Sequence, residues 1–421
     1  MEESRPEGEA AVGRPEGAPP RARWTVLWVT TFQQVALTFV RLGLPALAPF
    51  FRPDLGLSLT ETGLLLGIFD LGAMLTFYAT GLLTRRLGER PVLAMGAFVT
   101  GGVSALAAAS DGLLSMAPLL ALAGMGFPSS HVAGSQAVVD WFPRQERGLA
   151  MGVRQAGLPI GGFLAAAVLP TLAAAWGWRT ALATAGGLCA AAGLVVLATL
   201  PRNDAPSPPA AAAGWALPRR RVALAAVAGC CLIFAQFCLV GYLPLFLVDQ
   251  FGWGRERAAR MLLLVNLGGT AGRMGWGWLS DRAFGGSRSL PLLVVTTAGA
   301  AVLLGLSALD AAPAASALGV AALALVAGLT LLGWNALLNT FVAEMAGPST
   351  APVLGVMLTS LYLSSTAAPP LFGQAVEALG SYGPAWALVA ALQAVALVAL
   401  VRAGRGWTGP GADAAPAGRR A

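Results

Sequence analysis

The chain has 421 residues, of which 56% are hydrophobic and only 11% are charged, and its formal net charge is +7. A soluble domain of this length cannot bury so much apolar surface, so the composition excludes a globular soluble protein. It predicts an integral membrane protein. The positive net charge does not indicate a nucleic-acid partner, because arginine accumulates on the cytoplasmic faces of membrane proteins.

The chain begins with a polar segment, residues 1–23, which mixes Glu, Arg, Pro and Gly and is predicted to be a disordered cytoplasmic tail. Continuously apolar runs of roughly 20 residues or more follow, the length that an α-helix needs to cross a bilayer. The predicted spans are 24–50, 58–83, 91–110, 113–139, 147–172, 178–200, 221–249, 257–280, 290–309, 314–342, 351–377 and 382–402. We therefore expect an all-α integral membrane fold with twelve transmembrane helices in two pseudo-symmetric six-helix bundles.

The two predicted bundles cover residues 24–200 and 221–402, and a Pro- and Ala-rich cytoplasmic linker, 201–220, separates them. Residues 403–421 are predicted to be a second disordered tail. With the N-terminus inside, nineteen of the 27 arginines fall on the cytoplasmic side, five outside and three within spans. The positive-inside rule then places both termini in the cytoplasm and the protein in the cytoplasmic (inner) membrane.

A short polar segment lies between the second and third spans of each half. In the second half its glycine and charged positions are Gly277, Asp281, Arg282 and Arg288. In the first half the corresponding positions are Gly81, Arg85, Arg86, Glu89 and Arg90. The offset of 196 residues between the two glycines is close to half of the chain. A repeat of this kind in a membrane protein predicts two homologous halves with a substrate site between them.

These features together resemble the major facilitator superfamily of secondary transporters, over nearly the whole chain. The family's loop signature is Gly-x-Leu-x-Asp-Arg-x-Gly-Arg-Arg, which residues 277–288 match with a lengthened middle, whereas Arg85 stands where the family has Asp. Physically, Gly277 would let two helices approach closely, and Arg282 would reach a helix C-terminal end or a carboxylate. We expect both segments to act as conformational latches, with Glu89 as the substitute acid. The alternative is that their arginines only enforce topology.

Residues 140–162 contain Trp-Phe-Pro, Glu-Arg-Gly and a glycine-rich fifth span, and resemble the branch that moves small organic and inorganic anions. The Gly-Pro-x-x-Gly-Gly pattern of drug/proton antiporters is one residue out of register here. Glycine exposes backbone for helix packing and proline weakens a helix, so we expect the fifth and eleventh spans to contact the opposite half. The predicted gating or packing residues are Arg154, Gly157, Pro159, Gly161, Gly162, Arg273, Pro369 and Pro370.

Ionisable groups within spans are costly and are therefore candidate functional residues. Arg41 in the first span and Asp70 in the second lie at depths that allow them to pair. The pair is either structural or, if substrate or a proton breaks it, the coupling element. Arg154 and Arg273 lie near the cytoplasmic ends of their spans, where we expect them to extend toward the membrane surface. Three embedded arginines against one embedded acid favour an anionic substrate, because a guanidinium binds a carboxylate through two hydrogen bonds.

In the family that the chain resembles, spans one, four, seven and ten line the central cavity. The polar residues predicted there to bind substrate are Gln34, Thr38, Arg41, Ser130, His131, Gln236, Asn335 and Asn339. Asp70 and His131 are the candidates for proton coupling, since histidine titrates near neutrality. The alternative for His131 is a neutral ring hydrogen-bonded between helices.

We therefore predict a secondary active transporter that moves a small, carboxylate-like organic anion by alternating access with protons. An alternative is proton-coupled efflux of drug-like or neutral compounds. A membrane enzyme or receptor is disfavoured, because the sequence contains no nucleotide-binding loop and no Ser/His/Asp set, and its four cysteines lack metal-ligand spacing. We expect no cofactor, no metal and no nucleic-acid partner, and a monomer in contact with membrane lipid.

Overall fold

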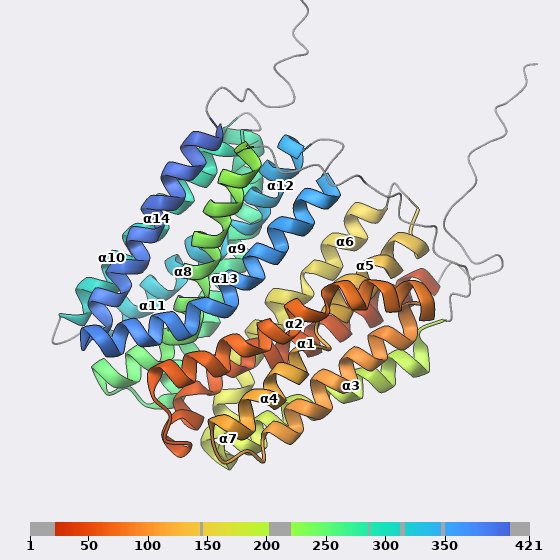
Figure 1. Cartoon of the computed structure of the whole chain (residues 1–421), viewed down its shortest axis with the longest axis horizontal. Helices are drawn as coiled ribbons and strands as arrows, with labels where there is room; N and C mark the ends of the chain where they lie inside the picture. The colour runs from red at the N-terminus through yellow and green to blue at the C-terminus, as the bar shows by residue number, and fades with distance from the viewer. Residues whose placement is uncertain are drawn as a thin grey trace, which may run out of the picture.

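The computed structural model describes residues 22–143, 146–201, 220–284, 287–311, 316–346 and 350–404, and these residues are helical, without a strand. They form two groups of helices, one made of the residues before 202 and the other of the residues after 219 (Figure 1). The predicted disordered tails and almost all of the predicted linker lie outside the described residues. The all-helical prediction is confirmed.

The helices follow the predicted ranges closely. In the first half they are α1 (Ala22–Asp54), α2 (Leu59–Leu87), α3 (Glu89–Ala107), α4 (Leu113–Gly124), α5 (Pro128–Trp141), α6 (Arg147–Gln155) and α7 (Gly157–Thr199). In the second half they are α8 (Arg220–Phe251), α9 (Arg255–Ala283), α10 (Ser289–Asp310), α11 (Ala317–Ala327), the π-helix η1 (Gly328–Leu332), α12 (Asn335–Ala346), α13 (Thr350–Leu379) and α14 (Tyr382–Gly404).

Nine helical stretches among the described residues are long and apolar enough to cross a membrane. One of them, Arg147–Thr199, is interrupted at Gly177, where a φ of 83° requires the left-handed conformation that glycine adopts readily. That interruption falls between the predicted fifth and sixth spans. The helices α9 and α13 cover the predicted eighth and eleventh spans but are not among the nine. The number of twelve spans therefore stays a prediction.

Three of the predicted spans are broken rather than continuous. The fourth is split by a turn at Met125–Phe127, the fifth at Ala156, and the tenth by the π-helix η1 and the turn after it. Pro128 and Pro159 each follow a break and have no N–H to donate to the carbonyl four residues earlier. Hydropathy alone could not show the first of these breaks, because the sequence stays apolar from residue 120 to residue 128, whereas Arg154 and Gln155 directly precede the second break and Asn335 directly follows the third.

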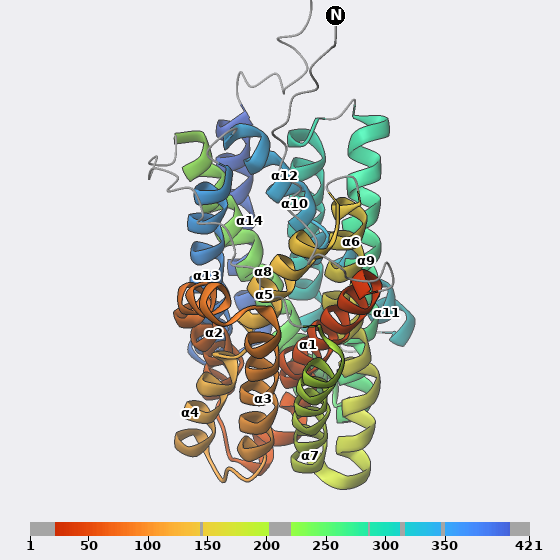
Figure 2. The ribbon, with the colours of Figure 1, turned by 90° about the vertical axis from the view of Figure 1, so that its right-hand side faces the viewer.

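The two halves make close contact along two pairs of helices, α2 with α13 on one side of the molecule and α7 with α9 on the other (Figure 2). A Cβ added at Gly67 would lie 2.2 Å from the carbonyl oxygen of Thr366, and one at Gly162 would lie 2.7 Å from Oδ1 of Asn266. The fifth and eleventh spans therefore contact the opposite half in this conformation, and the gating or packing role of their residues stays a prediction.

Two adjacent prolines explain why α13 can approach α2 so closely. Pro369 and Pro370 lie inside α13 and cannot donate to the carbonyls of Ser365 and Thr366. The free Thr366 carbonyl faces the glycine of α2, where Cα–H groups can approach it. This contact positions the Ser365 side chain against the first half.

The end of the molecule at the α1–α2 connection, which we call the α1–α2 end, is closed by polar contacts between the halves. The Tyr242 hydroxyl is 2.8 Å from both the Leu59 carbonyl, across the interface, and the Pro369 carbonyl. Arg52 Nη1 donates to Asp249 Oδ2 over 2.6 Å at the same end. In Figure 1 the two groups of helices converge here and diverge toward the opposite end, where α7 leads to residues 202–219 and which we call the linker end.

Candidate functional site

The predicted pair of Arg41 and Asp70 is present. Arg41 Nε donates to Asp70 Oδ1 over 2.7 Å, and Nη2 donates to Oδ2 over 2.8 Å. The Asp70 side chain is 2% exposed and that of Arg41 is 15% exposed. A carboxylate buried to this extent requires a cation or several hydrogen bonds to remain ionised, and the two parallel bonds provide both.

A third residue, which our sequence analysis did not place in the site, joins this pair from the opposite half. The Ser365 hydroxyl of α13 donates to Asp70 Oδ2 over 2.8 Å, and Ser365 is buried. Asp70 thus accepts hydrogen bonds from both halves of the molecule. No signal in the sequence separates Ser365 from the other small polar residues of its helix, because its role depends on the approach of α13 to α2.

Aromatic rings from both halves surround the Arg41 guanidinium. Its Cζ lies 4.9 Å from the ring centroid of Phe127, 5.1 Å from that of Phe237 on α8 and 5.7 Å from that of Tyr362 on α13. Such contacts stabilise a cation without neutralising its charge. Asp70 occupies the Nε and Nη2 atoms, and no described residue forms a hydrogen bond to Nη1. The Nη1 atom of Arg41 therefore has no acceptor among the described residues.

His131 lies beside this group on α5. Its ring centroid is 5.1 Å from that of Phe127, which also contacts Arg41, and its Nδ1 is 3.1 Å from Ser130 Oγ. The side chain of His131 is partly buried. The structure therefore brings the predicted residues Ser130, His131 and Arg41 together through Phe127.

The structure places Arg154 elsewhere than we predicted. Its side chain is fully buried and does not extend toward the membrane surface. Nη1 donates to Gln34 Oε1 over 3.0 Å and to the Ser130 carbonyl over 2.6 Å, and Nη2 donates to Ser135 Oγ over 2.7 Å. The expectation that Arg154 extends toward the membrane surface was wrong because α6 packs against α1 and α5, so that Arg154 points into its own half.

The predicted cavity-lining face of the first span is also occupied by helix packing in this conformation. Gln34 and Thr38 are buried, and Gln34 holds Arg154 instead of facing open space. A Cβ at Gly161 would lie 2.8 Å from the Cβ of Thr38, so α7 covers that position. Gly157 likewise lies against the side chain of Gln34, 3.5 Å from where its own Cβ would stand.

In the second half, Asn335 Nδ2 donates to Gln236 Oε1 over 3.2 Å. Asn335 begins α12 immediately after the π-helix and its turn, a kind of irregularity that is frequent at functional sites. Asn339 is exposed one turn later. Phe237, the neighbour of Gln236, contacts Arg41 and connects this pair to the first half.

Arg273 contributes to the same break in the tenth span. Its Nε is 3.4 Å from the carbonyl of Leu332, the last residue of the π-helix, and its side chain is partly buried. Trp276, one turn later on α9, donates to the Leu329 carbonyl over 2.9 Å. Both side chains therefore satisfy carbonyls that the irregular helix leaves free.

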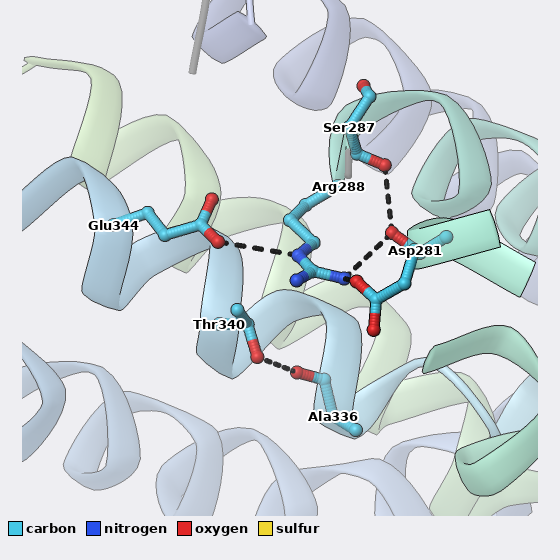
Figure 3. Close-up of polar contacts among 7 residues, drawn as sticks. Asp281, Ser287, Arg288, Ala336, Thr340 and Glu344 are labelled. Atoms are coloured by element: carbon cyan, nitrogen blue, oxygen red, sulfur yellow. Dashed lines mark hydrogen bonds and ion pairs between the residues drawn. The ribbon is translucent and has the colours of Figure 1, made fainter. Parts of the chain in front are cut away.

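The polar segment of the second half is centred on Arg288 (Figure 3). Arg288 Nη1 donates to Asp281 Oδ1 over 2.6 Å, and Nε donates to Glu344 Oε1 over 3.3 Å, as Figure 3 shows. The sequence did not indicate Glu344, which lies at the end of α12. Arg282 contacts the Trp278 ring at 5.5 Å and reaches neither a carboxylate nor a helix end among the described residues, contrary to our prediction.

We expected Gly277 to let two helices approach closely, but no atom lies within 4 Å of a Cβ placed there. In the first half, Arg85 and Arg86 are exposed at the end of α2, Glu89 is buried at the start of α3, and Arg90 donates to the Leu197 carbonyl. Their roles as latch residues stay predictions.

We expect Arg288→Gln to lower the thermal stability of the purified protein more than Arg282→Gln. The first change removes two ion pairs and leaves Asp281 and Glu344 without their cation, whereas the second removes one exposed ring contact. The melting temperature in detergent is the measurement. Equal melting temperatures for the two variants would show that the Arg288 contacts do not stabilise this conformation.

The fold and the site together define a polytopic membrane protein of two helical halves with charged side chains buried at their junction. The chain belongs to the Major Facilitator Superfamily, whose family model matches residues 30–369. It is thus a transporter and not an enzyme. Among the described residues, no group of three or more His, Cys, Asp or Glu could hold a metal ion.

Three relatives are similar over most of their length. An uncharacterized MFS-type transporter of Mycobacterium tuberculosis is 31% identical, with 90% of this chain and 85% of the relative covered. A probable sulfoacetate transporter of Cupriavidus necator is 24% identical (90% and 93% covered), and a hexuronate transporter of Bacillus subtilis is 25% identical (86% and 90% covered).

The fold matches that of a solved transporter. The structure of a bacterial homolog of the human lysosomal transporter Spinster, in an inward-facing and occupied conformation, superposes with a TM-score of 0.73 at 15% identity. The match covers 92% of this chain and 98% of that one. At this identity the match describes the fold alone.

Proposed function

We propose that the protein is a secondary active transporter that moves a small carboxylate-like organic anion across the cytoplasmic membrane by alternating access. One observation carries this proposal. Arg41 lies where the two halves meet, with one side of its guanidinium bound to Asp70 and the Nη1 side unoccupied by described residues. Because a guanidinium can bind two carboxylates at different edges, this side fits the carboxylate of a substrate.

The balance of charge supports an anion over a neutral compound. Arg41 and Arg154 bring two positive charges to the first half of the site, and Asp70 brings one negative charge. The substrates in the names of two relatives, sulfoacetate and hexuronate, are anions as well. Aromatic rings and amide side chains around the site would contact the rest of a small, partly polar molecule.

Proton coupling follows from the position of Asp70. Its carboxylate binds Arg41 in its own half and Ser365 in the other, so adding a proton would weaken contacts in both directions. A substrate carboxylate would compete with Asp70 for the same guanidinium, which makes anion binding and protonation interdependent. His131, hydrogen-bonded to Ser130, is the second candidate for the coupling proton.

Alternating access requires the contacts at the α1–α2 end to break and new contacts to form at the linker end. Between described residues, almost all hydrogen bonds that join the halves lie at the α1–α2 end. The exception is the bond from Ser365 to Asp70. With both termini in the cytoplasm, as the distribution of arginine favours, this conformation is closed toward the outside.

Uptake by proteoliposomes tests the proposal. We expect a pH gradient, acidic outside, to drive accumulation of D-glucuronate or sulfoacetate by the wild type, and Asp70→Asn to exchange the anion across the membrane without accumulating it. Asparagine keeps the size of the side chain but cannot carry the proton. Asp111→Asn, which changes a carboxylate that is 93% exposed between α3 and α4 and takes no part in the contacts between the halves, is the matched control and should still accumulate substrate.

Two outcomes would contradict parts of the proposal. Full accumulation by Asp70→Asn would remove that residue from coupling and leave His131→Gln as the next variant. Transport of hydrophobic cations, without transport of any carboxylate, would favour the alternative of drug efflux.

A further inference from the structure

Arg154 carries a buried charge that the transport proposal does not explain by contact. Its side chain is 0% exposed, and no ion pair joins it to a carboxylate among the described residues. Removing a guanidinium from water costs several kcal/mol unless a counter-ion is present. A buried arginine of this kind in a membrane protein therefore indicates a function for its positive charge.

The backbone of α5 is shaped to receive this guanidinium. A Cβ placed at Gly134 would lie 2.8 Å from Nη1 of Arg154, so any larger residue at that position would displace the side chain. Ser130 and Ser135 of α5 accept hydrogen bonds on either side of this glycine, and Gln34 of α1 accepts a third. The position of the charge is thus determined by two helices of the first half.

All three of these partners are neutral acceptors. They orient the N–H groups but do not cancel the charge, and Nε is buried without any partner. Charge that is not paired in a low-dielectric interior acts over longer distances than it does in water. Its effect therefore extends to the residues around it.

A series of contacts connects the unpaired charge of Arg154 to Arg41 in the proposed anion site. Ser130 accepts from Arg154 through its carbonyl, and its hydroxyl contacts His131, whose ring lies against Phe127. Phe127 in turn lies against Arg41. No residue in this series of contacts is an acid, and Asp70, the acid of the site, is paired with Arg41 and not with Arg154.

We infer that Arg154 makes the site selective for anions by its charge, held behind Ser130 and His131, without touching the substrate. With Asp70 ionised, Arg41 and Asp70 cancel, and Arg154 leaves the site with one net positive charge. This inference rests on the proposed function, since it assigns the source of selectivity for a carboxylate at Arg41. The class of ligand that it favours is a small organic anion over a neutral compound of similar shape.

A simpler role for Arg154 would be to join α1, α5 and α6 through its hydrogen bonds. The two roles predict different results for three variants. Arg154→Gln removes the charge, Arg154→Lys keeps the charge but loses the forked hydrogen bonds, and Ser135→Ala removes one bond and keeps the charge in place. A bracing role would make the lysine and glutamine variants equally defective in binding.

The experiment titrates purified wild type and variants with D-glucuronate and with sulfoacetate, and reads the apparent dissociation constant from the shift in melting temperature. We expect Arg154→Gln to weaken binding about tenfold, equal to about 1.4 kcal/mol, and Arg154→Lys and Ser135→Ala to bind within about threefold of the wild type. The unliganded melting temperature reports the structural effect of each change separately.

Binding by Arg154→Gln with wild-type affinity would overturn this inference and leave the proposed function intact. Equal weakening in Arg154→Lys and Arg154→Gln would overturn it in favour of the bracing role. If no tested anion stabilises the wild type, the proposed function fails and this inference fails with it. If Arg154→Gln does not fold, two variants that keep the charge still decide the question: Arg154→Lys, and Gly134→Ala, which displaces the guanidinium. Retained anion affinity in both supports the inference, and loss of affinity in both overturns it.

Discussion

Arg41→Gln is expected to abolish binding of D-glucuronate and sulfoacetate and to reduce the thermal stability of the protein sharply. The change removes the carboxylate-binding edge that faces the junction of the halves. It also leaves Asp70, 2% exposed, without its cation, and breaking a buried ion pair from one side costs about 3 to 5 kcal/mol. Thermal-shift titration of purified protein measures both effects.

A double variant separates the two effects. In Arg41→Gln/Asp70→Asn two neutral amides replace the ion pair, so we expect most of the stability to return while anion binding stays absent. Ser365 can still donate to the amide oxygen of the new side chain. Recovery of anion binding in the double variant, or wild-type affinity in the single one, would show that Arg41 does not bind the substrate.

Gly67→Ala is expected to reduce transport at least about tenfold by preventing the halves from closing at the α1–α2 end. Its Cβ would lie 2.2 Å from the backbone carbonyl oxygen of Thr366, and backbone atoms cannot move aside as a flexible side chain can. The variant should therefore favour the conformation that is open at this end. Gly102→Ala is the matched control, because no atom lies within 4 Å of the added methyl group.

Labelling of Ala368→Cys, in a background without the native cysteines, reports the conformational change. Ala368 is buried on α13, between the Thr366 and Pro369 carbonyls that face α2, so we expect a membrane-impermeant thiol reagent to reach it once α13 separates from α2. We expect faster labelling when Gly67→Ala is added and no change when Gly102→Ala is added. Unchanged labelling and transport in Gly67→Ala would show that the α2–α13 contact is not the closing element.

The Arg41–Asp70 pair was predictable for a general physical reason. Each residue is a rare charge in a long apolar helix, and two opposite charges at compatible depths in adjacent spans have few other partners. Glu344 offered no such signal, because it lies at a helix end where acidic residues are usually solvated. Its contact with Arg288 depends on how α12 packs after the break in the tenth span.

The sequence by itself determined that the protein is helical and membrane-embedded and that Arg41 and Asp70 could pair, and it predicted that the two halves repeat. Hydropathy, spacing and the cost of a buried charge are properties of single helices and need no packing information. Only the tertiary structure decided that Arg154 points into its own half, that Ser365 reaches Asp70, and where the helices break. These features depend on the rotation and close approach of helices that are distant in sequence, which the glycines permit and no local pattern specifies.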